Sequence, residues 1–416
     1  MSVLWLVFHI VEFLLWGLLA ASAAYILFFA LVSLLRKRPP SPLKAYLSGQ
    51  VRAMRGDRQH SFLILFPAYG EDRVIVGSVR AFLQQGYPAS RFHVAVISDH
   101  MLPETNDQLR RLPVTLLTPR FEKSSKARAM QYAMDCLTAP ADKGPTFGGF
   151  DYVVILDADN VVETDFLSRL NECCQQGYQA IQCHRRAKNS DNSIAVLDGV
   201  SEEINNTIFR KAHNRVGLSS ALIGSGMCFD LKWFGAHVHQ LSTAGEDREL
   251  EALLLKERIY IHYEPDIHVF DEKVSSKDNF QRQRLRWMTA QVQSLCSMLP
   301  YIPKAIVTGN IDYIDKTIQQ ALIPRSMLIA LTFVLAIPVT LVTPPWGVKW
   351  WLLFLFICLA LYLSTPRQMR RHSVFGKLTA LPPLAWKMVL NILKIDRAST
   401  DFIHTTHNKQ NLKPKT

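Results

Sequence analysis

The stretch YVVILDAD, residues 152–159, decides the fold class of this 416-residue chain. Five consecutive apolar or aromatic residues are followed directly by Asp157, Ala158 and Asp159. A short continuous apolar run is typical of a strand that is buried on both faces, as in a parallel sheet. We therefore expect an α/β domain in which two carboxylates stand at the end of a central strand.

Two similar runs precede this one. Residues 61–66 (SFLILF) end at a proline, and residues 92–97 (FHVAVI) end at Ser-Asp. Residues 73–85 and 125–137 have helical character and separate the runs. Strands that alternate with helices predict a mostly parallel sheet.

Ligands of open α/β sheets bind outside the carboxyl ends of the strands. Side chains suited to such a site follow the three runs: Tyr69, Glu71, Asp99, Asp157 and Asp159. Two carboxylates one residue apart can bind a hard divalent cation, which also binds phosphate oxygens. The position at the mouth of a sheet supports a cation site, and a solvated turn remains the alternative.

Two later segments carry further candidates. Glu246 and Asp247 begin a helix with apolar periodicity. Acids at this position are either an ordinary helix start or include a carboxylate that the helix dipole keeps ionised and able to accept a proton. Residues 281–287 (QRQRLRW) are either a basic helix facing lipid or arginines that bind a diphosphate through forked hydrogen bonds. In the second case Trp287 would offer a flat face to a sugar ring.

Three apolar blocks predict membrane-spanning helices: residues 3–35, 318–342 and 346–364. The first block lacks the charged start and short apolar core of a cleaved signal peptide. Basic clusters follow the first block, at residues 36–38, and the third, at residues 367–372. The positive-inside rule then places everything between the first and second blocks in the cytoplasm, on an inner or plasma membrane.

The polar residue Glu12 lies within the first block. A carboxylate there is either a polar contact inside the bilayer or an interfacial residue near the outer end, and we favour the second.

These observations divide the chain into five parts. We expect an N-terminal transmembrane helix at 1–38, a cytoplasmic domain at 39–288, interfacial helices at 289–317, a transmembrane hairpin at 318–364 and a cytoplasmic tail at 365–416.

The tail holds two candidate segments. Residues 384–395 have lysines at helical spacing among apolar residues, which predicts an amphipathic helix in the membrane interface. Residues 402–407 (FIHTTH) are either a plain polar tail or a segment that resembles the gating loop of cellulose synthases, with histidines where valine and lysine are usual.

Composition excludes several classes of protein. With 49% hydrophobic and 20% charged residues, the chain is not disordered. The net charge is +12, from 47 basic and 35 acidic residues, and its basic clusters lie at the membrane ends and in residues 281–287. We therefore do not expect nucleic acid as a partner. Seven cysteines without framework or metal-ligand spacing are read as reduced thiols facing a cytosol.

The order of the motifs is distinctive as a set. It runs PAYGE (67–71), Asp99, KARAMQ (126–131), DAD (157–159), GSG (224–226), GED (245–247) and QRLRW (283–287). Over residues 60–290 and the flanking apolar segments, this order resembles the membrane-embedded family 2 glycosyltransferases. That group contains cellulose, chitin and hyaluronan synthases and ceramide glucosyltransferase.

The resemblance implies a GT-A fold, a UDP-sugar donor and Mg²⁺ or Mn²⁺. It implies donor contacts from Pro67, Tyr69, Glu71, Asp99, Lys126, Asp157 and Arg286. It implies acceptor contacts from Gly224, Ser225, Glu246, Gln283 and Trp287. Asp157 and Asp159 match the DxD metal site, with Asp159 as the more direct ligand, and Asp247 matches the general base. The family's TED is GED here, and its Asp-Asp pair on the second strand is Ser98-Asp99.

The same resemblance leaves the acceptor open. A synthase that extrudes a β-linked polysaccharide is our first expectation, and transfer of one sugar to a membrane lipid is the alternative. Three spans are few for a private polymer channel, so a polymer would need a pore shared between subunits of a homo-oligomer. An inactive sugar-binding subunit is the remote alternative, although every expected carboxylate is present.

Overall fold

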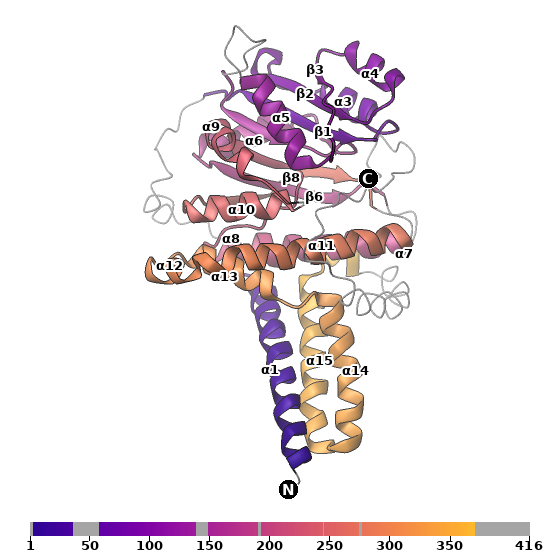
Figure 1. Ribbon diagram of the computed structural model, residues 1–416, viewed down its shortest axis with the longest axis vertical. Helices are drawn as coiled ribbons and strands as arrows, with labels where there is room; N and C mark the ends of the chain where they lie inside the picture. Colours follow the sequence, from indigo (N-terminus) through magenta and orange to yellow (C-terminus); the bar gives the residue numbers. More distant parts are fainter. Residues whose placement is uncertain are drawn as a thin grey trace.

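The computed structural model describes residues 3–35, 58–138, 149–189, 193–243, 245–273 and 277–370. Along the long axis of the molecule, Figure 1 shows a sheet domain, then a layer of helices that lie across the molecule, and then a bundle of long helices. The sheet and the bundle are therefore separated by a helical layer, and the site is built where these levels meet.

The sheet has eight strands in the order β3-β2-β1-β4-β7-β6-β8-β5. The strands are β1 (Phe62–Tyr69), β2 (Phe92–Asp99), β3 (Thr115–Leu117), β4 (Tyr152–Ile155), β5 (Val161–Val162), β6 (Ala180–Ala187), β7 (Met227–Asp230) and β8 (Ile261–Asp271). Strands β1 to β4 are parallel, as are β6 and β8, whereas β7 runs antiparallel to both of its neighbours. The expected mostly parallel α/β class is confirmed.

The central strand β4 is buried on both faces. Successive residues of a strand point to opposite faces, so Val153 and Ile155 join one core cluster while Val154 and Leu156 join the other. Every residue of this strand must therefore be apolar, which explains the continuous run.

Helices cover both faces of the sheet. One core contains α3 (Ile75–Phe82) and α6 (Phe166–Gln175). The other contains α5 (Lys126–Thr138), α9 (Leu231–His237) and α10 (Glu246–Lys256).

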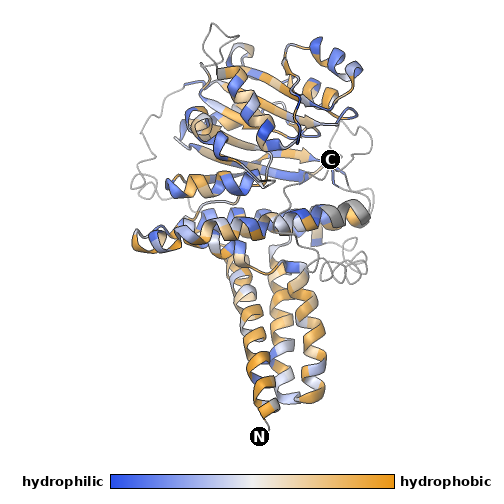
Figure 2. Ribbon diagram, viewed as in Figure 1, coloured by the Kyte–Doolittle hydropathy of each residue, from blue (hydrophilic) through white to orange (hydrophobic). Residues whose placement is uncertain are grey.

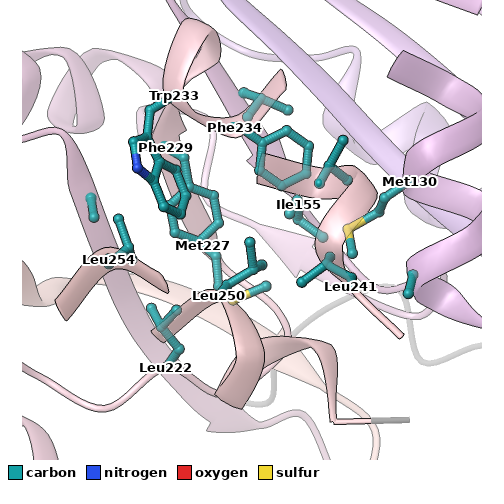
Figure 3. Close-up of a cluster of buried hydrophobic side chains, with 14 of the residues drawn as sticks. Met130, Ile155, Leu222, Met227, Phe229, Trp233, Phe234, Leu241, Leu250 and Leu254 are labelled. Atoms are coloured by element: carbon teal, nitrogen blue, oxygen red, sulfur yellow. The ribbon is translucent and has the colours of Figure 1, made fainter. Parts of the chain in front are cut away.

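Figure 3 shows how α10 is held on the second core. Leu250 and Leu254 of α10 lie near Phe229 and Ile155 of the sheet, and both leucines are completely buried. A leucine in such a position typically contributes about 2–5 kcal/mol to stability relative to alanine. The first turn of α10, which carries Glu246 and Asp247, is therefore anchored to the sheet by the packing of the turns that follow it.

The remaining short elements complete the domain. They are η1 (Ala89–Arg91), α4 (Pro103–Arg110), α7 (Ser193–Asn205), the π-helix η3 (Asn206–Ala212), α8 (His213–Arg215) and η4 (Val238–Gln240).

The transverse layer consists of α11 (Lys277–Met298), η5 (Leu299–Tyr301), α12 (Ile302–Val307) and α13 (Ile311–Ala321). These helices lie across the ends of the long helices (Figure 1). Their position suits the interfacial role expected from the sequence.

Among the described residues, three helices are long and apolar enough to cross a membrane: α1 (Val3–Val32), α14 (Arg325–Val342) and α15 (Pro344–Ser364). Figure 2 shows them as mainly hydrophobic along their length. The second span begins at Arg325 rather than near residue 318, because α13 ends at Ala321 and Pro324 precedes the new helix. Residues 318–321 instead form the last turn of the transverse layer.

The carboxylate of Glu12 is buried among the long helices. Its two oxygens accept hydrogen bonds from Lys349 Nζ at 2.8 Å and Trp350 Nε1 at 2.5 Å. Both partners lie in the first two turns of α15, next to the α14–α15 turn. Glu12 therefore lies toward the end of the bundle that is away from the sheet, and Lys349 compensates the charge of its carboxylate.

The opposite end of α1 is tied to the transverse layer. Tyr25 Oη donates to Asp315 Oδ1 of α13 at 2.7 Å, and Phe29 stacks on the ring of His213 with centroids 3.7 Å apart. Such contacts fix α1 against the helices that carry the site.

Residues 36–57 and 371–416 lie outside the described part of the chain. The basic cluster at 36–38, the amphipathic segment at 384–395 and the FIHTTH segment at 402–407 all fall there.

Candidate functional site

The carboxyl ends of β1, β2 and β4 meet at one edge of the sheet, as the sequence predicts. Tyr69 pairs in register with Asp99 on the neighbouring strand. Asp157 and Asp159 follow β4, which pairs with β1 on its other side. A cavity of about 1240 Å³ opens at this edge.

The cavity collects nearly all residues that the sequence singles out. It is lined by Pro67, Tyr69, Glu71, Asp99, Lys126, Asp157, Asp159, Gly224, Glu246, Asp247, Gln283, Arg286 and Trp287. Ser225 is the exception: its side chain is completely buried, and it is not part of the cavity wall. Its acceptor contact stays a prediction from the resemblance, since its side chain does not line the cavity.

Lys126 is the centre of the charged part of the cavity. It begins α5, and its Nζ donates a hydrogen bond to Asp157 Oδ1 and another to the carbonyl of Gly224. The same ammonium lies 3.7 Å from Glu246 Oε1. A single lysine thus connects the end of β4, the loop at Gly224 and the start of α10.

The environment shifts the protonation of this group of residues. Burial alone would raise the pKa of the Asp157 carboxyl, but Lys126 outweighs it and holds that pKa below its usual value. Burial alone would lower the pKa of Lys126, but Asp157 and Glu246 raise it. Burial raises the pKa of Glu246 to about 7, against the opposing effect of Lys126 and with a further increase from Asp247.

Asp159 has a different environment from Asp157. It is only 6% exposed, and its carboxylate accepts hydrogen bonds from the backbone N–H of Glu272 at 2.7 Å and from Asn160 Nδ2 at 3.2 Å. Within the described ranges, no cationic side chain lies within 4.0 Å of its carboxylate oxygens. Neutral donors orient this carboxylate without neutralising it, so it suits a divalent cation. The two acids therefore fit the metal that the DxD motif implies.

The start of α10 brings two more acids to the cavity. Gly224 has φ of +78°, and a Cβ atom at that position would lie 3.6 Å from Glu246 Oε1 and 4.0 Å from Asp247 Oδ2. The left-handed backbone favours glycine here, whereas the distances to the two acids are ordinary van der Waals contacts. Asp247 is the second residue of the helix and faces the same space.

The first two strands contribute the other side of the cavity. Asp99 is 3% exposed, and its Oδ1 lies 2.6 Å from His100 Nδ1. The ring of His100 faces that of Tyr69 with centroids 5.1 Å apart. His100 was not singled out in the sequence, where it is simply the residue after a strand.

The QRLRW segment lies in α11 and reaches the cavity from the transverse layer. Gln283, Arg286 and Trp287 all line it. Arg284, between them, lies over the ring of Trp287 at 4.8 Å and donates to Asp198 Oδ1 at 2.7 Å. The segment is therefore part of the site and not only a basic surface.

A second charged cluster lines the cavity and was not foreseen. Arg185 on β6 lies 3.1 Å from Glu202 and 3.4 Å from Asp271. Lys273 lies 3.0 Å from Asp271, and Arg210 lies 3.2 Å from Glu202. The only signal in the sequence was the basic run RRAK at residues 185–188, at the end of a strand.

The cavity extends well beyond the charged residues, toward the long helices. Its wall there is formed by Ile26, Ile329, Ala330, Phe333, Val334, Phe354, Cys358, Leu361 and Tyr362. One continuous space thus joins the acids at the strand ends to an apolar groove between α14 and α15.

Comparison with solved structures finds several similar folds. A mannosyltransferase from Pyrobaculum calidifontis in complex with GDP-Man and Mn²⁺ has 15% identity and a TM-score of 0.46, with 91% of this chain and 98% of that chain covered. TarS 1–349 of S. aureus in complex with UDP-GlcNAc has 11% identity and a TM-score of 0.39, with 80% and 89% covered. The same protein in complex with UDP has 13% identity and a TM-score of 0.35, with 56% and 65% covered. No curated protein matches the sequence.

The family comparison is more direct. The model of the glycosyltransferase-like family 2 matches residues 60–290, which is more than half of the 416 residues and spans the sheet, both charged clusters, the start of α10 and the QRLRW segment. This chain therefore belongs to glycosyltransferase family 2.

Proposed function

We propose that the protein transfers a sugar from a UDP-sugar to a hydroxyl group of a membrane lipid, with inversion at the anomeric carbon. The observation that carries this proposal is the continuity of the cavity. The same space is lined by Asp157 and Asp247 at one end and by Phe333 and Leu361 of the long helices at the other.

The donor lies at the edge of β1, β2 and β4. Tyr69, Glu71 and Asp99 hold the uracil and ribose, with Pro67 ending the apolar part of β1 beside them. Arg286 faces the diphosphate from α11 and stabilises its charge through forked hydrogen bonds.

Asp157 and Asp159 would hold Mg²⁺ or Mn²⁺, and the bound ion would stabilise negative charge on the diphosphate leaving group. Lys126 already compensates the negative charge of Asp157, so Asp159 would be the stronger ligand for the cation.

Asp247 is the general base of the reaction. Its carboxylate takes the proton from the acceptor hydroxyl as the oxygen attacks the anomeric carbon from the face opposite UDP. The new C–O bond forms as the bond to the diphosphate breaks, and UDP leaves with the bonding electron pair. One displacement of an α-linked donor gives a β-linked product.

The acceptor side is formed by α11 and the long helices. Trp287 provides a flat face for a sugar or a polar head, and Gln283 and Gly224 line the space near the base. Phe333 and Val334 are 43% and 47% exposed, so this part of the groove faces the surroundings of the bundle, where lipid would lie. An acceptor can therefore enter from the membrane.

Polysaccharide synthesis, our first expectation from the sequence, is the second candidate. The observation in its favour is the position of Trp287 and Gln283 in the cavity wall. A hydrophilic chain would, however, need a polar path along the bundle, and the described groove wall is mainly apolar there. The lipid acceptor fits this wall better.

The proposed orientation places the sheet domain in the cytoplasm, because UDP-sugars are cytoplasmic metabolites and basic clusters flank the spans. The membrane would then be an inner or plasma membrane.

UDP release tests the proposed reaction. Full-length protein in lipid nanodiscs is given Mn²⁺ or Mg²⁺ and a panel of UDP-sugars, and the configuration of any glycosylated lipid is determined by NMR. We expect one UDP-sugar to give UDP and a β-glycosylated lipid. Asp107→Asn, on the exposed surface of α4, serves as the matched control for Asp247→Asn. An α-linked product, or equal turnover by both variants, would contradict the proposal.

A further inference from the structure

Two guanidinium groups meet at one neutral oxygen where the cavity reaches the long helices. Nη2 of Arg284, on α11, lies 3.4 Å from Ser201 Oγ, and Nη2 of Arg325, on α14, lies 3.2 Å from the same oxygen. Arg325 Nη2 also donates to the Ser201 carbonyl at 3.1 Å. All three side chains line the cavity. Like charges placed this close repel each other unless an anion lies between them.

The carboxylates nearby do not complete this arrangement. Asp198 pairs with Arg284 at 2.7 Å. Glu202 is already within 3.7 Å of three cations, namely Arg185, Arg210 and Lys273. Its charge is therefore already shared among three cations, and its carboxylate is not within 4.0 Å of Arg325.

Arg325 itself has no counter-ion in the described part of the chain. No carboxylate lies within 4.0 Å of it there, and its Nη1 is buried without a hydrogen-bond partner. It is the first residue of α14, where the helix dipole disfavours a cation. Helix stability does not explain an arginine at this position, whereas an anion beside it would.

The surroundings indicate what carries this anion. On one side the cavity continues along α15 from Thr365 to Phe354, 11 residues apart, which is about 17 Å of helix. That is roughly half of the 30 Å hydrocarbon thickness of a bilayer. On the other side, α11, which carries Trp287, lies between the long helices and α10, whose first turn carries Asp247 (Figure 1). The order along the cavity is thus apolar groove, arginine pair, general base.

We propose that the acceptor is a lipid in which a phosphodiester or diphosphate lies between the apolar tail and the hydroxyl group that receives the sugar. This inference rests on the proposed lipid-acceptor function and specifies its substrate class. The tail lies in the groove between α14 and α15, the phosphate between Arg284 and Arg325, and the terminal hydroxyl at Asp247. Arginine suits this role because its planar fork binds two phosphate oxygens at once.

A binding experiment tests the inference without requiring turnover. Full-length protein is incubated with dioleoylphosphatidylmethanol, which has a phosphodiester but no hydroxyl, or with dioleoylglycerol, which has the same tails and a hydroxyl but no phosphate. Native mass spectrometry then counts the lipids retained. We expect wild-type protein to retain phosphatidylmethanol about 10-fold or more over dioleoylglycerol, as expected for charge-assisted hydrogen bonds.

Substitutions locate the contact. Arg325→Gln should abolish this preference, and Arg325→Lys should retain part of it. Arg169→Gln, which alters a partly exposed arginine of α6 outside the cavity, should leave it unchanged. Should Arg325→Gln fail to fold, the Arg325→Lys variant and the comparison of the two lipids on wild-type protein still decide the question.

Three outcomes would overturn the inference. They are equal retention of the two lipids by wild-type protein, equal phosphatidylmethanol retention by wild-type and Arg325→Gln protein, and displacement of phosphatidylmethanol by UDP. The last would assign the arginines to the donor diphosphate. A wild-type protein that binds phosphatidylmethanol selectively but releases no UDP from any UDP-sugar would leave the inference standing and refute the proposed function instead.

Discussion

The ammonium group of Lys126 donates a hydrogen bond to the carboxylate of Asp157, the first acid of the Asp157–Asp159 pair. This contact between Lys126 and Asp157 joins the start of α5 to the end of β4 inside the cavity. The two acids therefore have different charge environments: a cation compensates Asp157, whereas neutral donors hydrogen-bond to Asp159.

Lys126→Met should therefore make the metal-free protein less stable and more responsive to metal. Removing the ammonium leaves Asp157 without a partner, at a cost of about 2 kcal/mol in the free energy of unfolding. A divalent cation would then replace the lost positive charge. We expect Mn²⁺ to raise the Tm of Lys126→Met protein more than that of the wild type. An identical Tm increase in both would show that Lys126 and the metal do not share Asp157.

Asp159→Ala should weaken donor binding only when metal is present. The variant loses the carboxylate that has no cationic side chain within 4.0 Å among the described residues, so the metal-dependent part of UDP affinity should fall about 10-fold or more. UDP binding with Mn²⁺ and with EDTA measures this difference by calorimetry. Asp165→Asn, on the exposed start of α6, is the control. If Asp159→Ala keeps the full gain in affinity from Mn²⁺, Asp159 is not a metal ligand.

Asp247→Asn should keep donor binding and lose transfer. The amide has the same shape but cannot accept the proton, so kcat should fall by about 10²- to 10⁴-fold while the KM for the UDP-sugar changes little. Initial rates of UDP formation over a range of donor concentrations separate the two constants. A large increase in KM with an unchanged kcat would instead assign Asp247 to donor binding.

The free energy of unfolding of the metal-free protein should decrease as the pH rises, because of Glu246. Burial raises its pKa from 4.5 to about 7, so the folded state binds this proton more tightly than the unfolded state. The stabilisation is complete below about pH 4.5 and is lost as the pH rises through 7; over that range the linked free energy is on the order of 3 kcal/mol. Unfolding in EDTA at pH 5 and pH 8 measures it. Glu246→Gln should remove most of the loss of stability between pH 5 and pH 8. If this variant shows the same pH dependence of stability as the wild type, Glu246 is not the cause of that dependence.

The sheet and its acidic edge could be predicted from local sequence because burial on both faces demands apolar runs. Residues 61–66, 92–97 and 152–156 became β1, β2 and β4 for this reason, and Asp99, Asp157 and Asp159 follow directly from their ends. The sequence predicts an earlier start for this span than α14 has, because apolar residues of α13 and of the link before Pro324 continue the hydropathy of the span.

Other parts of the site depend on contacts between distant positions. Arg325 and Ser201 are separated by 124 residues, and no local pattern brings them together. The burial of Ser225 also could not be read from local sequence: it lies between two glycines that suggest an exposed loop, yet its side chain is completely buried. Its surroundings come from distant positions, since Gln182 of β6 donates a hydrogen bond to its carbonyl at 2.9 Å.

Mass-spectrometric sizing of the product tests the central claim most directly. Purified full-length protein in lipid nanodiscs is supplied with Mn²⁺, the active UDP-sugar and a lipid extract, with Asp247→Asn protein as the blank. The account predicts a single product series in which one lipid gains the mass of one sugar. A ladder of masses separated by one sugar would contradict it and establish a polysaccharide synthase in its place.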